Sequence, residues 1–326
     1  MKKIFITGGA GYVGSVLTPY LISKGYEVTV LDLMIYGSDV LKINKNLKII
    51  EGDIRDKKLL KKLIPGHNAV IHLACISNDP SFELNPKLGE TINFKAFEPL
   101  VKISKECGVE SFIYASSSSV YGIKNIKNVD ETQSREPLTD YSKFKANCED
   151  ILLNYQSNYF TTTIIRPATV CGFGPRQRLD VVVNILTNLA YHKRKILVYG
   201  GEQLRPNIHI DDMARVYELL IEADKEIVAG QVFNAGYENQ KVIDLASTVK
   251  KVIGEDVITE VVKTNDNRSY HISSEKIKKV LGFSAKKTIE DAVRDLKYAF
   301  DNKILKNTLI DEKFFNIKRM NSLQLK

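Results

Sequence analysis

The fold of this chain is decided by one glycine-rich stretch near its start, TGGAGYVG at positions 7–14. A short, mostly apolar run, Lys3–Ile6, precedes the stretch and has the length of a buried strand. Val13–Ser23 follows it and carries apolar residues at helical spacing. A strand, a glycine turn and a helix in this order are typical of a dinucleotide-binding unit.

Each glycine of the turn has its own task in such a unit. Gly8 takes the tight-turn conformation, Gly11 leaves room for a pyrophosphate, and Gly14 lets the helix pack closely on the strand. The first N–H groups of the helix, around Tyr12 and Val13, face the phosphates. We therefore expect these five residues to hold a dinucleotide.

An acidic residue identifies which dinucleotide is expected. The second predicted strand, Glu27–Leu31, ends at Asp32, which lies 18 residues beyond Gly14. A carboxylate at this distance accepts a hydrogen bond from the ribose 2′-hydroxyl of the adenosine and repels a 2′-phosphate. The sequence therefore predicts NAD rather than NADP as the cofactor.

The ends of the next two predicted strands add further cofactor contacts. Ligands of a doubly wound sheet collect at the carboxyl ends of its strands. The third strand, Leu47–Ile50, leads to Asp53 and Ile54, which we expect beside the adenine. The fourth strand ends at Leu73 and is followed by Ala74, whose small side chain leaves room for the cofactor.

Strands alternate with helices up to about residue 171 and predict an α/β, Rossmann-type, doubly wound parallel sheet. From Gly172 the alternation loosens, which indicates a smaller, interleaved C-terminal substrate lobe. We expect a strand at 208–210 and another at 232–234 to return to the main sheet. The expected parts are an NAD-binding domain at 1–171 with 208–235, a substrate lobe at 172–207 and 236–302, and an unassigned tail at 303–326.

Composition narrows the class of protein. The chain has 326 residues, of which 44% are hydrophobic, so it can bury a sizeable core, and no stretch is apolar for long enough to span a membrane. The net charge of +8 comes from scattered lysines rather than from a basic stripe, so nucleic-acid binding is not expected. Four cysteines without paired spacing predict reduced thiols in a cytoplasmic protein.

Candidate chemistry follows the fifth predicted strand, Ser111–Ala115. A run of four serines continues from this strand at the carboxyl edge, and Tyr141 and Lys145 lie one helical turn apart further along the chain. A nearby ammonium lowers the pKa of a phenol, so Tyr141 is expected to act as the base that takes a proton from a sugar hydroxyl. A serine hydroxyl opposite would bind the same oxygen, and hydride transfer to a nicotinamide would require no metal.

With these motifs in order, the chain resembles the extended short-chain dehydrogenase/reductases, the nucleotide-sugar epimerase and dehydratase family, over roughly residues 1 to 300. The resemblance implies that Ser117 is the catalytic serine, with Tyr141 as base and Lys145 as its partner. It also implies that Arg205 and Arg268 bind the substrate diphosphate, because a guanidinium can donate two parallel hydrogen bonds to phosphate oxygens.

Two departures from the family pattern bear on the reaction. Sugar 4,6-dehydratases of this family place an aspartate and a glutamate directly before their Val-Tyr-Gly, where this chain has Ser118 and Ser119. Elimination therefore lacks its usual acid and base, and Ser118 is assigned to the substrate instead. Many relatives also carry an asparagine at the position of Thr169, a further expected substrate contact.

Two segments resemble the branch of the family that acts on GDP-heptoses for surface polysaccharides. They are residues 77–83 and the run PRQRLD at 175–180, which supplies Arg176 and Arg178 as expected substrate contacts. The resemblance implies oxidation of the C4 hydroxyl of a GDP-heptose to a 4-keto sugar.

Several alternatives stay open at this stage. The same residues would serve a 4-epimerase, which returns the hydride to the other face of the sugar. A non-catalytic regulator that senses a dinucleotide would have no use for Tyr141 and Lys145. The predicted helices at 85–107 and 141–155 carry apolar residues beyond one face, and the resemblance implies that they pair in a homodimer.

Overall fold

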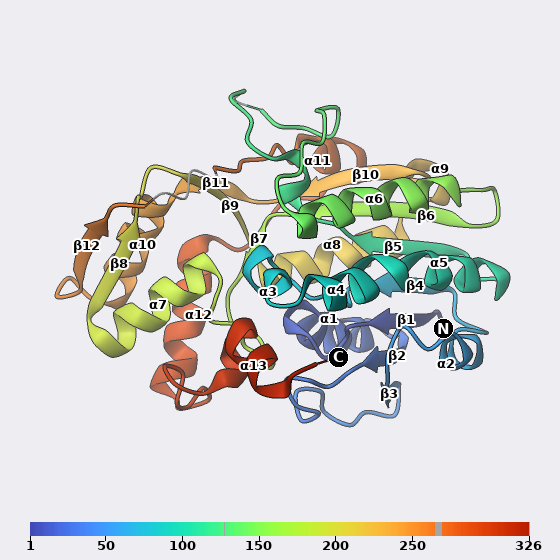
Figure 1. Ribbon diagram of the computed structural model, residues 1–326, viewed down its shortest axis with the longest axis horizontal. Helices are drawn as coiled ribbons and strands as arrows, with labels where there is room; N and C mark the ends of the chain where they lie inside the picture. Colours follow the sequence, from blue (N-terminus) through green and yellow to red (C-terminus); the bar gives the residue numbers. More distant parts are fainter. Residues whose placement is uncertain (127, 265–268, 326) are drawn as a thin grey trace.

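The computed structural model describes residues 1–126, 128–264 and 269–325. It has two parts, a large parallel sheet with helices on both faces and a smaller lobe beside it (Figure 1). Within the described ranges, no helix is both long enough and apolar enough to cross a membrane.

The main sheet has seven strands, and every neighbouring pair in it is parallel. Its first six strands follow the doubly wound order, in which the chain reverses direction across the sheet between β1 and β4. The predicted fold class is confirmed. In spatial order the strands are β3 (Leu47–Glu51), β2 (Glu27–Asp32), β1 (Lys3–Thr7), β4 (Ala69–His72), β5 (Ser111–Ala115), β6 (Thr161–Pro167) and β10 (Gln231–Ala235).

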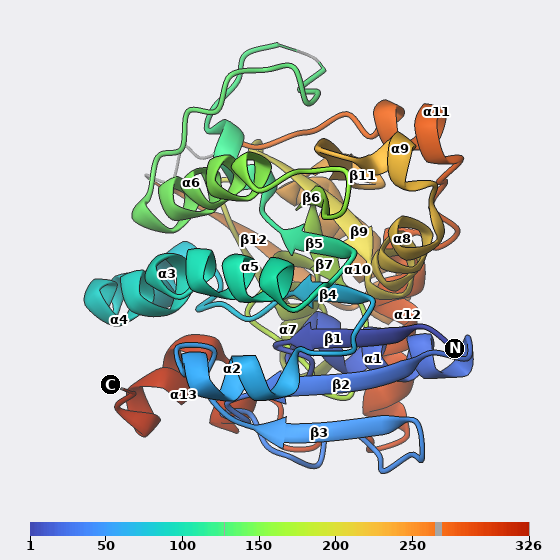
Figure 2. The ribbon, with the colours of Figure 1, turned by 90° about the vertical axis from the view of Figure 1, so that its right-hand side faces the viewer.

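Both faces of this sheet are buried because its strands are apolar on both sides. In β1, Ile4 and Ile6 belong to the core on one face, and Phe5 belongs to the core on the other. Figure 2 shows the two helical layers on opposite sides of the strands. One layer contains α1 (Tyr12–Ser23), α8 (Ile210–Glu222) and α11 (Glu275–Leu281), and the other contains α2 (Lys57–Leu63), α5 (Phe97–Glu106) and α6 (Asp140–Asn154).

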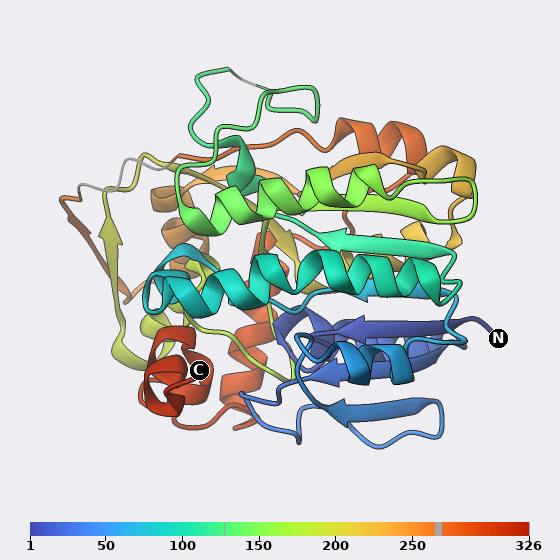
Figure 3. The same ribbon diagram turned by 45° about the vertical axis from the view of Figure 1, so that its right-hand side comes forward.

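The segment expected to be mostly helical from 85 to 107 is helical for most of its length (Figure 3), but it consists of successive elements, and a separate short helix precedes it. Asn78 and Asn85 each cap a new helix with a proline in its first turn, which suits a helix start but not a helix interior. The side chain of Asn93 bonds both backbone groups of Ile76 and so ties this region to the loop after β4. The pieces are α3 (Asp79–Glu83), α4 (Pro86–Glu90) and the π-helical turn η1 (Thr91–Lys95).

The lobe contains two small sheets rather than an extension of the main one. The prediction that the strand around 208–210 joins the main sheet is wrong, because β9 pairs with β7 and β11. The chain returns to the main body with α8, which packs on α1, with β10, and later with α11, which packs on β10. The lobe comprises β7 (Thr169–Cys171), β9 (Leu204–His209), β11 (Glu238–Lys241), β8 (Lys195–Tyr199), β12 (Ile258–Val262), α7 (Val182–Lys193), α10 (Val242–Ile253) and α12 (Ile289–Asp301).

The tail that the sequence left unassigned is folded. Phe314 is buried against Leu179, Leu296 and Phe300. Met320 belongs to the core between the main sheet and the layer of α2 and α5. The tail is therefore anchored by apolar side chains at several points along its length. The remaining short elements are η2 (Ser118–Tyr121), α9 (Lys225–Val228), η3 (Glu312–Phe314) and α13 (Asn316–Leu323).

Candidate active site

A cavity of about 470 Å³ lies where the carboxyl ends of the main strands face the lobe, a volume within the usual range for a ligand site. Residues of the glycine turn, the serine run and the start of α6 line it from the main body. Residues of β7, β9 and the tail line it from the other side. The expected site residues that line it are Gly8, Gly11, Tyr12, Val13, Gly14, Leu73, Ser117, Ser118, Tyr141, Lys145, Thr169, Arg176, Arg178 and Arg205.

The glycine turn has the shape that a dinucleotide requires. Gly8 has φ +76°, and a Cβ on it would lie 2.6 Å from the backbone nitrogen of Ala74. A Cβ on Gly14 would lie 2.4 Å from the carbonyl oxygen of Gly8, so neither position tolerates a side chain. Gly11 caps α1 without any side-chain hydrogen bond, which leaves the first N–H groups of the helix directed at the site. The residues present therefore fit the pyrophosphate of NAD.

Asp32 is held in a fixed orientation at the end of β2. Its Oδ2 accepts a hydrogen bond from the N–H of Ala10 at 3.0 Å, and its Oδ1 accepts one from the N–H of Met34 at 2.9 Å. Burial raises the pKa of Asp32, and these two N–H groups oppose that rise. Each carboxylate oxygen keeps a second lone pair, which suits it to accept a ribose hydroxyl.

The other residues expected near the adenine are arranged less directly. Asp53 accepts hydrogen bonds from Arg55, whose Nε lies at 2.9 Å and Nη2 at 2.6 Å. Burial works against the charge of Asp53, but these bonds hold its pKa below the usual range. Asp32, Asp53, Ile54 and Ala74 are not among the described residues that line the cavity. The carboxylate of Asp53 is therefore engaged with Arg55 and does not line the cavity.

The structure brings Ser117, Tyr141 and Lys145 to one wall of the cavity. Tyr141 and Lys145 lie one turn apart at the start of α6, as their spacing predicts. Lys145 is buried, and its Nζ donates to the carbonyl oxygen of Ala115 at 2.6 Å. Ser117 begins η2, and its hydroxyl accepts a hydrogen bond from the N–H of Ser119 at 3.1 Å.

The pKa of Tyr141 differs from the sequence-based expectation. Burial raises it, and electrostatic interactions with Cys75 and Asp79 raise it further. The Lys145 ammonium lies 5.9 Å from the centre of the Tyr141 ring but 4.9 Å from that of Tyr114, so it is shared between two rings and a carbonyl. Arg178, which no spacing in the sequence links to Tyr141, lowers this pKa.

Asp79 is a site residue that the sequence analysis did not assign. It begins α3 directly after Asn78, which has φ 72°, and its carboxylate accepts a hydrogen bond from the hydroxyl of Thr139. Asp79 lines the cavity on the side of Tyr141. The Asn-Asp-Pro start of a helix was the available signal, but it predicts a cap and not a functional carboxylate.

A buried polar network holds the serine run and α6 together. Glu149 of α6 accepts hydrogen bonds from Arg166 of β6, whose Nε lies at 3.0 Å and Nη2 at 2.6 Å. Glu149 also accepts one from the hydroxyl of Ser116, and the Nη1 of Arg166 donates to the hydroxyl of Tyr121 at 2.7 Å. This network fixes the helix that carries Tyr141 against the strand that leads to Ser117.

The expected substrate residues meet from several elements. Arg178 is ion-paired with Asp180 at 2.6 Å and donates to the hydroxyl of Ser77 at 3.2 Å. Arg205 on β9 stacks over Tyr270, with its guanidinium carbon 5.6 Å from the ring centre. Ser118 and Thr169 line the cavity beside them. Arg268, expected at the substrate diphosphate, lies outside the described residues.

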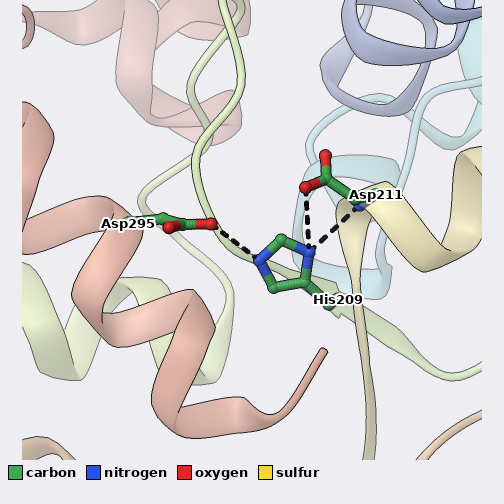
Figure 4. Close-up of side chains that lie close together, drawn as sticks. All are labelled: His209, Asp211 and Asp295. Carbon is green, nitrogen blue, oxygen red and sulfur yellow. Dashed lines mark hydrogen bonds and ion pairs between the residues drawn. The ribbon is translucent and has the colours of Figure 1, made fainter. Parts of the chain in front are cut away.

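One group of three possible metal ligands lies away from this wall (Figure 4). The Nδ1 of His209 accepts a hydrogen bond from the N–H of Asp211 at 3.1 Å, and its Nε2 lies 3.1 Å from Oδ2 of Asp295. An acceptor at Nδ1 requires the proton on Nε2, so both ring nitrogens are already engaged. The arrangement joins β9 to α12 and leaves no imidazole lone pair for a metal.

Comparison with known proteins agrees with this geometry. The model of the NAD dependent epimerase/dehydratase family matches residues 4–236. The dTDP-D-glucose 4,6-dehydratase of Dictyostelium discoideum is 28% identical over 78% of this chain and 62% of its own length. The human dTDP-D-glucose 4,6-dehydratase is 28% identical over 85% of this chain and 83% of its own.

Among solved structures, the UDP-glucose 4-epimerase of Thermotoga maritima with UDP-glucose is similar at a TM-score of 0.82. It is 26% identical, and the match covers 93% of this chain and 100% of that one. Both reaction types of the family therefore occur among the similar proteins.

Proposed function

Since this chain belongs to the NAD dependent epimerase/dehydratase family and is therefore an NAD-dependent enzyme, we propose that it oxidises the C4 hydroxyl of a nucleotide-linked sugar and leaves the C6 oxygen in place. The observation that carries the proposal is the shared cavity. Ser117, Tyr141 and Lys145 line it together with the glycine turn, so a hydroxyl bound at Tyr141 lies in the same space as the cofactor.

Tyr141 is the proposed acid and base. Its phenol oxygen takes the C4 hydroxyl proton during oxidation and returns it during reduction, while the hydroxyl of Ser117 donates a hydrogen bond to the same sugar oxygen. NAD, when bound, accepts the hydride from C4. Because burial raises the pKa of Tyr141, the phenolate needs cations nearby, and the chain supplies Lys145 and Arg178.

Retention of the C6 oxygen is proposed from Ser118 and Ser119. Both line the cavity at the positions where the dehydratases carry carboxyl groups. Expulsion of a C6 hydroxyl requires an acid for the leaving oxygen and a base for the neighbouring proton. An alcohol side chain is a poor source of either, so the proposed product is the 4-keto sugar or its C4 epimer.

Asp79 favours a second candidate, a 4,6-dehydratase. Among the described residues that line the cavity, the carboxylates are Asp79 and Asp180, and Asp79 lies on the side of Tyr141. Asp79 is therefore the group best placed to replace the missing acid. The two similar proteins from Dictyostelium discoideum and human are dehydratases, which supports testing this alternative.

The proposed substrate class is a nucleoside diphosphate sugar. The resemblance at residues 77–83 and 175–180 favours a GDP-heptose, whereas the similar proteins are named for dTDP-glucose and UDP-glucose. Arg205 and Arg268 are the proposed diphosphate ligands. Incubation with dTDP-, UDP- and GDP-linked sugars and NAD, followed by mass spectrometry and NMR, tests the proposal. No reaction at C4 of any of them would overturn it.

We also propose a homodimer through α5 and α6. Phe94 and Phe144 stack at 5.1 Å and remain only half-buried, which leaves apolar surface on this layer. Light scattering should give twice the chain mass of 36.8 kDa at micromolar concentration. A mass equal to one chain would contradict this proposal.

A further inference from the structure

The C-terminal segment, defined here as residues 311–323, is built into the wall of the cavity. The carbonyl oxygen of Phe314 accepts a hydrogen bond from the N–H of Leu179 at 2.9 Å, and the Nε of Arg319 donates to the carbonyl oxygen of Ile35 at 2.5 Å. The segment thus joins the loop after β2 to the run at 175–180, and α13 lies between the lobe and the first strands (Figure 1).

Asn316 is the polar centre of this segment. It is 97% buried and lines the cavity, and its N–H donates to Oδ2 of Asp180 at 2.8 Å. Its Nδ2 donates to the hydroxyl of Ser77 at 2.9 Å, and its Oδ1 accepts from Nη2 of Arg176 at 2.5 Å. Every polar atom of the Asn316 side chain is therefore engaged with residues of the main body.

Arg176, which Asn316 holds, is incompletely bonded. Its side chain is buried, and its guanidinium lies flat over Tyr36, 3.6 Å from the ring centre. Neither Nε nor Nη1 has a hydrogen-bond partner among the described residues. Burial lowers the pKa of Arg176, the neighbouring charge of Arg178 lowers it further, and the opposing effects of Tyr36 and Asp180 do not restore it. Each of these donors can form a charge-assisted hydrogen bond to a phosphate oxygen.

The position of Arg176 indicates which group would complete it. Its own N–H donates to the hydroxyl of Ser15 in α1 at 3.1 Å, so the residue sits beside the helix whose first turn faces the site. It lines the same cavity as Gly11 and Tyr12. Its side chain therefore lies at the outer edge of the space assigned to phosphate.

We propose that Arg176 binds a diphosphate through one of its two unpartnered donors, Nε or Nη1, and that Asn316 of the C-terminal segment is the positioning residue that holds it there. The diphosphate belongs either to NAD or to the nucleotide sugar. In the second case the inference rests on the proposed function.

Calorimetric titration of nucleotide-free protein distinguishes the two sources. We expect Arg176→Met to raise the dissociation constant of NAD, or that of UDP, dTDP or GDP, by about tenfold to a hundredfold, the usual effect of losing hydrogen bonds to a charged group. Arg176→Lys should recover only part of this affinity, because an ammonium keeps the charge but lacks the planar set of guanidinium donors. Asn316→Ala should weaken the same ligand, whereas Ser322→Ala, a control on the same helix, should bind as the wild type does.

Stability of the ligand-free protein separates this role from a structural one. Arg176→Met removes an unpaired buried charge and should unfold at a temperature no lower than the wild type. Unchanged affinity for every nucleotide, or a loss of affinity accompanied by a lower unfolding temperature, would overturn the proposal. Binding of NAD requires no turnover, so this result is independent of whether C4 oxidation is found.

Discussion

Arg166 and Arg176 are equally buried, each with 4% of its surface exposed, but their partners differ. All three nitrogens of the Arg166 guanidinium donate, two to Glu149 and one to Tyr121. Arg176 donates one side-chain hydrogen bond, to Asn316, and stacks on Tyr36. A buried guanidinium left partly unbonded costs free energy, so Arg166 fits a structural role and Arg176 fits a role completed by a ligand.

The two pKa directions agree with this comparison. Burial disfavours charge on both arginines, but Glu149 raises the pKa of Arg166 above its ordinary value, and the pKa of Arg176 stays below its own. The comparison therefore separates residues that stabilise the structure around the cavity from residues that bind a ligand in it. Tyr141, Arg166, Arg176 and His72 allow the separation to be tested in order of expected effect.

The largest effect is expected at Tyr141, which lies outside the comparison of the two arginines. Tyr141→Phe should reduce turnover by about two to four orders of magnitude, the range for removal of a positioned acid and base. The dissociation constant of NAD and the unfolding temperature should hardly change, because the ring remains. Steady-state kinetics and calorimetry measure both. Near-normal turnover would mean that the base is elsewhere.

Loss of the ion pair between Arg166 and Glu149 should destabilise the protein without a specific effect on nucleotide binding. Arg166→Met leaves the buried carboxylate of Glu149 without its main partner, so we expect a loss of about 3–5 kcal/mol in the free energy of unfolding, measured in urea. The double variant Glu149→Leu/Arg166→Met should recover much of this loss, because it removes both charges. Equal stability of Arg166→Met and the wild type would contradict the structural role.

For Arg176→Met we expect the opposite pattern in the free energy of unfolding and in the affinity for a nucleotide. That variant should keep its stability and lose affinity for a diphosphate. If both arginine variants lost stability alone, the distinction between the two regions would fail.

At neutral pH the smallest effect is expected at His72, a buried group on the structural side of the comparison. Its Nδ1 lies 2.7 Å from the hydroxyl of Thr7, and burial lowers its pKa from 6.5 to about 3. Between these values the unfolded chain takes up a proton that the folded protein refuses. Stability should therefore be complete above pH 6.5 and fall by about 1.4 kcal/mol per unit below it.

Unfolding of His72→Gln provides the check. Its stability should depend less steeply on pH than that of the wild type between pH 6.5 and pH 4, with the other acid-sensitive groups common to both proteins. Identical slopes would show that His72 is not held neutral.

The main sheet is predicted well from the sequence because the spacing of hydrophobic residues distinguishes its strands from its helices. The glycine turn and the Tyr141–Lys145 spacing are local patterns too, and the structure places both at one cavity. The lobe is harder, since β9 pairs with β7 rather than with the main sheet, a choice between two non-local partners. No periodicity distinguishes them.

The polar contacts of the site could not be predicted for a similar reason. Arg176 and Asn316 are 140 residues apart, and neither stands in a pattern that indicates the other. The raised pKa of Tyr141 depends on burial and on Asp79, 62 residues earlier, whereas the sequence displayed only the nearby lysine. Spacing shows which groups share a helix turn, but burial and remote charge decide how they titrate.

The central claim is that this enzyme acts at C4 and does not expel the C6 oxygen. The most direct test is to supply a nucleotide sugar labelled with heavy oxygen at C6, with NAD in catalytic amount, and to analyse the product by mass spectrometry. The account predicts a 4-keto sugar or a C4 epimer that retains the label. A 6-deoxy-4-keto product without the label would contradict it, and loss of that product in Asp79→Asn would identify Asp79 as the acid that Ser118 and Ser119 do not provide.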